Sequence, residues 1–161
     1  MQEFANIQSI RNAIFDLLSS VNMATEENTK LLDYIIKLFN ENGLSSDYYG
    51  YHNIDHELEV TYVTLMSAIH LFNEKKFESD DVKYLFASAL LHDFDPQKAS
   101  DRPHEKNVID FINNDKEIQK LLQNANIDFN IICALILRTV YPWTGDIKLA
   151  TEEGIKNYLT S

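Results

Sequence analysis

Apolar residues recur at intervals of three and four positions along most of this chain. Near its start they fall at Phe4, Ile7, Ile10, Ile14, Leu17, Leu18 and Val21. On an α-helix this spacing gathers apolar side chains on one face, which packs against a core. No alternation of apolar and polar residues is sustained long enough for a sheet, and the chain has no internal repeat. The sequence therefore predicts an all-α fold.

Helix caps and helix breakers divide this pattern into about six to eight helices. Thr25, Ser79 and Asp128 are suited to cap three of them, and Pro103 stands near the start of another. The predicted helical segments are 4–21, 25–42, 53–73, 79–93, 103–112, 118–122, 128–141 and 151–158. Because 161 residues with 45% hydrophobic side chains suffice for one core, we expect a single compact domain, a helical bundle.

Charge and composition exclude several classes of function. The formal net charge of −11 repels a phosphate backbone, so we expect no nucleic-acid binding and no anionic-membrane binding. The first twenty residues contain no continuous apolar segment of signal-peptide or membrane-spanning type, so we expect a cytoplasmic protein. Cys133 is the only cysteine, which excludes an intramolecular disulfide and a cysteine-based zinc site. Any metal ion must therefore use histidine and carboxylate ligands.

Three of the five histidines lie in two short stretches that could form one site. His52 and His56 are four residues apart and would project from one face if the helix began at His52. His92 and Asp93 end a strongly apolar run, and a proline three residues later favours a helix end near Asp93. His70 lies roughly 21 Å along the helix from His56, so we expect it to be a core or surface residue.

Imidazole and carboxylate groups at these spacings are typical of a divalent-metal site. A divalent ion with positions open to water lowers the pKa of that water toward about 7 and polarises a phosphoryl oxygen. A histidine just outside the coordination sphere can protonate the leaving oxygen, and His52 is placed for that role. The alternative is that each histidine is an ordinary polar or packed residue.

Two motifs carry a resemblance to a known family. They are Tyr51-His52-Asn53-x-x-His56-x-x-x-Val60 and Ala89-Leu90-Leu91-His92-Asp93. This pair resembles the HD-domain metal-dependent phosphohydrolase superfamily, and within it the 3′,5′-cyclic nucleotide phosphodiesterases and their short bacterial or archaeal relatives. The resemblance implies one HD domain over residues 1–161, with two N-terminal helices in 4–42, a metal-site core in 51–140 and a C-terminal turn and short helix in 141–161.

The resemblance also implies roles for individual residues. His56, His92 and Asp93 would be metal ligands, with Asp93 able to bridge to a second ion. His52 would be the general acid, and Asn53 would support the ligands from outside the coordination sphere.

The family pattern includes a further, distal aspartate. The corresponding position here holds Val140, which cannot bind a metal. Asp146 could replace it if the following turn folds back, or the site could have three ligands, or the aspartate could lie beyond the end of this chain. His104 and Glu105 look like a pair found near the metal in several family members; the alternative is an acidic first helical turn with an exposed histidine.

The leading hypothesis is a metal-dependent phosphohydrolase, an enzyme that acts on a small phosphorylated substrate such as a nucleotide or cyclic nucleotide. It would bind one or two divalent ions, for which Fe, Mn, Zn, Ni, Co and Mg are all candidates. The alternative is a catalytically impaired HD domain that acts as a regulatory or interaction module. A third hypothesis is a di-iron oxygenase on the same fold. The sequence leaves the oligomeric state open.

Overall fold

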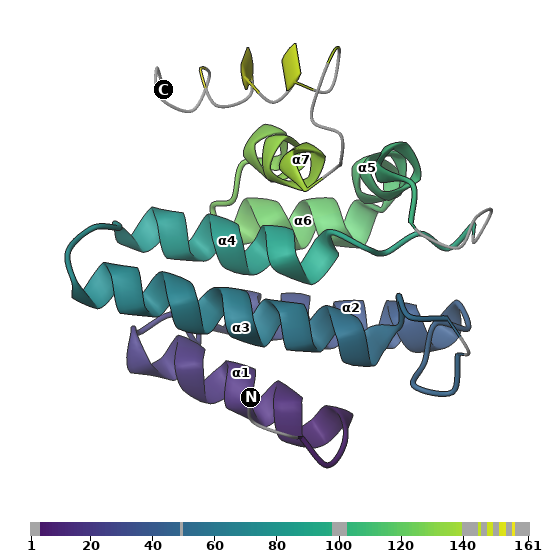
Figure 1. Cartoon of the computed structure of the whole chain (residues 1–161), viewed down its shortest axis with the longest axis horizontal. Coiled ribbons are helices and arrows are strands. Elements are labelled where there is room, and N and C mark those ends of the chain that lie inside the picture. Colours follow the sequence, from purple (N-terminus) through teal and green to yellow (C-terminus); the bar gives the residue numbers. More distant parts are fainter. Residues whose placement is uncertain are drawn as a thin grey trace.

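The computed structural model describes residues 4–48, 50–97 and 103–139, together with a few separate positions further on. Within these residues the protein is entirely helical, which confirms the predicted all-α fold (Figure 1). The helices are α1 (Ile7–Ser20), α2 (Glu26–Glu41), α3 (Ile54–Asn73), α4 (Ser79–Leu91), α5 (Glu105–Asn114), α6 (Lys116–Asn124) and α7 (Phe129–Arg138).

Side-chain caps explain where most of these helices begin. The Thr25 hydroxyl accepts a hydrogen bond from the backbone N–H of Asn28 at the start of α2. The carboxylate of Asp128 accepts one from the backbone N–H of Asn130 at the start of α7. Both caps were predicted, because a short polar side chain before an apolar stripe satisfies a free N–H group of the first turn.

The starts of α4 and α5 are among those that differ from the prediction by one or two residues. Glu78, and not Ser79, is the N-cap of α4, where its backbone N–H donates to Asp81 in a capping box. His104 is the N-cap of α5, and its Nδ1 accepts from the N–H of Lys106. Pro103 therefore precedes the cap, and His104 does not lie in the first helical turn.

The longest helix, α3, lies between α4 and α1 and packs against both (Figure 1). Helix α7 covers α4 from the other side, while α6 packs against α2 and α5. One continuous apolar core fills the space between them, and its largest fully buried side chains are Phe39, Phe86 and Phe94. This packing brings the N-terminal end of α3 beside the C-terminal end of α4, where the two predicted motifs lie.

Some predictions fall on residues that the structure does not describe. Val140 and Asp146 lie outside the described residues, as does most of the predicted turn and short helix in 141–161.

His70 was expected to be a core or surface residue, and its side chain is 71% exposed beside Glu74. In the part of the chain that is described, no helix combines the length and apolar character needed to cross a bilayer.

Candidate metal centre

The first half of the site is the N-terminal end of α3. Asn53 is its N-cap, with an extended backbone (φ −119°, ψ −178°), and its side-chain oxygen accepts a hydrogen bond of 3.1 Å from the N–H of His56. Asn53 therefore fixes the first helical turn of α3, which carries His56.

His52 reaches the site by another route than the sequence suggested. Because Asn53 is the cap, His52 precedes the helix, and the idea that His52 and His56 project from consecutive turns of one helix is wrong. The bend before the cap nevertheless turns the ring of His52 toward α4, so that the two imidazole centroids lie 5.4 Å apart.

The second half of the site is the C-terminal end of α4. The helix ends at Leu91, two residues before the predicted end near Asp93, and His92 is its C-cap. Nδ1 of His92 lies 2.8 Å from the carbonyl oxygen of Ala89, one turn earlier, and donates to it. In the neutral imidazole this leaves the lone pair on Nε2, the ring nitrogen that faces Asp93.

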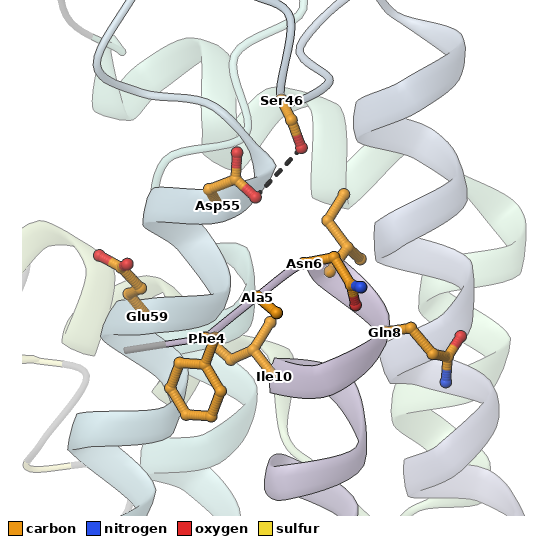
Figure 2. Close-up of a pocket in the computed structure, with 9 residues that line it drawn as sticks. Phe4, Ala5, Asn6, Gln8, Ile10, Ser46, Asp55 and Glu59 are labelled. Carbon is orange, nitrogen blue, oxygen red and sulfur yellow. Dashed lines mark hydrogen bonds between the residues drawn. The ribbon is translucent and has the colours of Figure 1, made fainter. Parts of the chain in front are cut away.

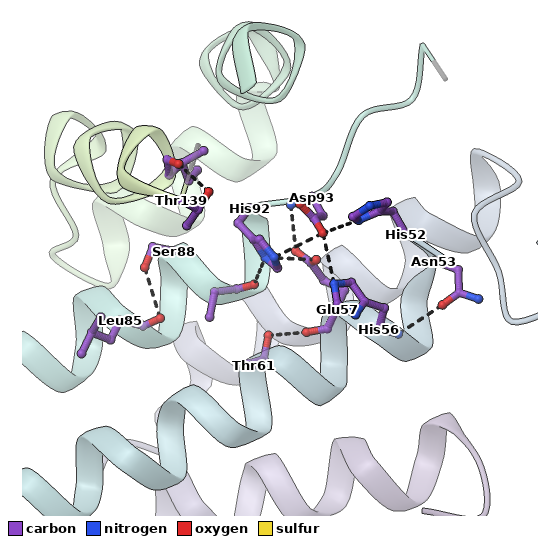
Figure 3. A network of polar contacts seen from close by, with 12 residues as sticks. His52, Asn53, His56, Glu57, Thr61, Leu85, Ser88, His92, Asp93 and Thr139 are labelled. Carbon is purple, nitrogen blue, oxygen red and sulfur yellow. Dashed lines mark hydrogen bonds and ion pairs between the residues drawn. The ribbon is translucent and has the colours of Figure 1, made fainter. Parts of the chain in front are cut away.

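The Oδ2 atom of Asp93 is the point where the two helix ends meet (Figure 3). It lies 2.6 Å from Nδ1 of His52, 3.3 Å from Nε2 of His56 and 3.3 Å from Nε2 of His92. Three imidazole rings from two separate motifs thus surround one carboxylate oxygen.

The surroundings of Asp93 stabilise its charged form. Burial alone would raise the pKa of this carboxyl group, but hydrogen bonds from His56, His92 and His52 outweigh burial and hold the pKa well below its usual range. Asp93 is therefore a carboxylate at any physiological pH and is suited to bind a cation.

The structure adds one residue that sequence reasoning missed. Glu57 follows His56 on α3, its side chain is 0% exposed, and its Oε2 lies 3.2 Å from Nδ1 of His92. Its Oε1 lies 3.5 Å from the backbone nitrogen of Asp93. Oε2 has no hydrogen-bond partner, because Nδ1 of His92 is directed at the Ala89 carbonyl.

Glu57 and His92 influence each other's protonation. Burial raises the pKa of Glu57, and the attraction of His92 opposes that rise. Burial acts to lower the pKa of His92, but the attraction of the nearby charges of Glu57 and Asp93 raises it to about 11. A cation that binds at Nε2 of His92 must therefore take the place of a proton.

These side chains make a donor set that fits a divalent metal ion. His52, His56 and Asp93 offer one group of donor atoms within 4.8 Å of one another, and Glu57, His92 and Asp93 offer a second. Two ligands that bind one ion at about 2.0–2.2 Å lie about 3.0–3.5 Å apart. The two contacts of 3.3 Å between Asp93 and Nε2 of His56 and His92 match this spacing. The contact of 2.6 Å from His52 is instead a hydrogen bond.

No family model, no curated protein and no solved structure matches this chain. The residues of the site are therefore the basis on which a function is proposed.

Other predicted residues lie apart from these donor groups. His104 and Glu105 belong to neither of them, and the side chain of His104 is 58% exposed. Asp95 is buried, and its two oxygens accept hydrogen bonds from the N–H groups of Gln97 and His104 and from the side chain of Asn107. Asp95 thus holds the chain between α4 and α5. A metal-linked role for His104 and Glu105 stays a prediction.

A separate cavity of about 560 Å³ lies between the segment before α1 and one face of α3 (Figure 2). Its lining includes Phe4, Asn6, Ile10, Asp55 and Glu59. None of the donor residues of the candidate metal centre is among the described residues that line it.

Proposed function

We propose that this chain is a metal-dependent phosphohydrolase of the HD-domain type, which hydrolyses a phosphate ester of a nucleotide or cyclic nucleotide. The observation that supports it best is the position of Asp93 Oδ2, within 2.6–3.3 Å of His52, His56 and His92. These four residues come from the two motifs that resemble the family, and they are 41 positions apart at their widest spacing.

In this proposal His56, His92 and Asp93 hold the metal ion. Asp146, outside the described residues, is the proposed additional ligand. A divalent ion bound there would polarise a phosphoryl oxygen and lower the pKa of a water molecule. The end of α4 also favours a cation, because the carbonyl groups of the last helical turn give it partial negative charge.

His52 is the proposed general acid. Its Nδ1 donates to Asp93 Oδ2 at 2.6 Å, which orients the ring. The side chain is 25% exposed, so its second nitrogen, Nε2, can receive a proton from solvent and deliver it to a leaving oxygen.

The charge of the protein makes the cation necessary for this chemistry. A net charge of −11 repels a phosphorylated substrate from most of the surface. A bound divalent ion beside three imidazoles would reverse this repulsion locally, so we expect phosphate to bind only in the metal-loaded protein.

The alternative is an HD domain without turnover, which acts as a regulatory or interaction module. It is supported by the small number of carboxylates in the donor groups, where the described residues contribute only Asp93 and Glu57. Such a domain, with or without a bound metal ion, would not hydrolyse a phosphate ester.

Hydrolysis of bis(p-nitrophenyl) phosphate and p-nitrophenyl phosphate with added Mn²⁺ tests the proposal. We expect turnover by the unaltered chain and none by His92→Ala. His52→Ala should lose about 10²- to 10⁴-fold in kcat while it retains the metal.

His70→Ala is the matched control, because His70 is exposed and far from the site on the same helix. Its activity should equal that of the unaltered chain. Metal binding without turnover would favour the regulatory module, and loss of both metal and activity in His52→Ala would refute the general-acid role.

A further inference from the structure

Glu57 is a fully buried carboxylate on the buried face of α3. Its neighbours on that face, Ile54, Leu58 and Thr61, are also 0% exposed. Burial of a polar group without a hydrogen-bond partner is unfavourable, and burial of an unpaired charge is more unfavourable still. Yet Oε2 of Glu57 has no hydrogen-bond partner. The core alone gives no reason for a carboxylate at this position.

The imidazole of His92 forms an ion-pair contact with this unpartnered oxygen. Oε2 lies 3.2 Å from Nδ1, and this nitrogen also donates to the Ala89 carbonyl at 2.8 Å. The proton on Nδ1 therefore lies near two acceptors, the Ala89 carbonyl oxygen and Oε2 of Glu57. Nε2, on the other side of the ring, lies 3.3 Å from Asp93 Oδ2.

We propose that Glu57 is a positioning residue for His92: its carboxylate holds the Nδ1 side of the ring so that Nε2 points at the metal centre beside Asp93. The inference rests on the proposed function, in which His92 is a metal ligand. Histidine ligands commonly donate their second nitrogen to a carboxylate or a backbone carbonyl, which fixes the tautomer and the ring orientation. Here both kinds of acceptor are present.

The side of the ring on which Glu57 lies distinguishes this role from direct metal binding. Nδ1 carries the proton of the hydrogen bond to the Ala89 carbonyl, so this nitrogen has no lone pair for a metal ion. The Glu57 carboxylate contacts the ring at that nitrogen, with Oε2 3.2 Å from Nδ1. Glu57 also immediately follows His56, so one turn of α3 supplies both a proposed ligand and the support for another from α4.

The test is titration of the metal-free full chain with Zn²⁺ and Co²⁺ by calorimetry. Glu57→Leu removes both the acceptor and the charge, and we expect it to weaken the affinity about 10- to 100-fold. Glu57→Gln retains an acceptor of nearly the same shape and should lose less. The visible spectrum of bound Co²⁺ should change in Glu57→Leu, because His92 is no longer held in place.

The thermal stability of the metal-free variant sets the temperature of this titration. Removal of one partner of a buried charge pair leaves the other charge uncompensated, so metal-free Glu57→Leu should unfold below the temperature of the unaltered chain, and the metal titration is made at a temperature at which the variant is still folded. Glu57→Met is the second variant if the leucine does not fit. Glu59→Leu is the matched control, since Glu59 is an exposed glutamate on the same helix, and its metal affinity should not change.

A measurement on the metal-free protein tests the inference when no ion binds. The ¹⁵N signals of the His92 ring should shift in Glu57→Leu and stay unchanged in Glu59→Leu. Unchanged ring signals, or unchanged affinity in a folded Glu57→Leu variant, would overturn the role of Glu57. Absence of metal binding by the unaltered chain would instead refute the proposed function.

Discussion

Replacement of Phe94 by alanine should strongly destabilise the fold next to the candidate metal centre. Phe94 follows Asp93 directly and is 0% exposed. Its ring centroid lies 4.9 Å from that of Phe39 and 4.7 Å from that of Phe111. A buried Phe→Ala change costs about 3–5 kcal/mol, and the two aromatic contacts favour the upper half of that range. For a chain of 161 residues, the midpoint of thermal unfolding should fall by about 8–20 °C.

Urea unfolding followed by circular dichroism measures this loss. The midpoint concentration should fall while the slope stays the same, since the surface exposed on unfolding hardly changes. Phe94→Leu should cost much less, and Met66→Ala is the control because Met66 is 46% exposed. A loss below about 1 kcal/mol for Phe94→Ala, similar to the control, would refute the packing argument.

Three further predictions concern the Asn53 helix cap, the buried carboxylate of Asp95 and the buried thiol of Cys133. Asn53→Ala should lower the free energy of unfolding by about 1 kcal/mol in urea, and Asn53→Asp should recover most of it; equal losses would contradict the cap. Asp95→Ala removes the acceptor of three hydrogen bonds, so the same assay should show that the free energy of unfolding falls by about 2–3 kcal/mol. An unchanged free energy of unfolding would show that these hydrogen bonds do not stabilise the fold. Burial and the nearby Asp128 raise the pKa of Cys133 to about 12. Stability should therefore be unaffected by this thiol below about pH 8.5 and should fall as the pH rises toward 12. Titration with a thiol reagent at pH 8.5 should be much slower than for the unfolded chain, and equal rates would contradict the shift.

The strongly periodic segments made most of the fold predictable. The apolar stripe of α1 and the caps Thr25 and Asp128 each require only local information, and the structure has them where the sequence suggested. The start of α5 was harder to predict, because His104 can act as a cap only when its ring turns back to the N–H of Lys106. Such a contact depends on the chain that Asp95 holds in place, and not on residue preference.

The candidate site shows the same division between local and tertiary information. The two motifs suggested that His56, His92 and Asp93 share a site. The structure places His56 and His92 each 3.3 Å from Asp93, but the two histidines belong to different donor groups. The path of His52 was not predictable from helical spacing, because the Asn53 cap places His52 before the helix. Only the packing of α3 on α4 determines that its ring reaches Asp93.

The sequence around Glu57 indicates that this residue is unusual. It occupies the same helix face as Ile54, Leu58, Thr61 and Leu65, which forms the buried stripe of α3. A carboxylate on an apolar stripe is seldom fully buried without a partner. Its partner, His92, lies on another helix, so the sequence could indicate that Glu57 is unusual but could not indicate what it contacts.

Metal content is the most direct test of the central claim that His56, His92 and Asp93 form a metal centre. The chain should be purified without added metal or a histidine tag and measured by mass spectrometry beside His92→Ala. The account predicts about one or two transition-metal ions per chain, lost in the variant. Absence of metal from both proteins, even after incubation with Mn²⁺ or Fe²⁺, would contradict it.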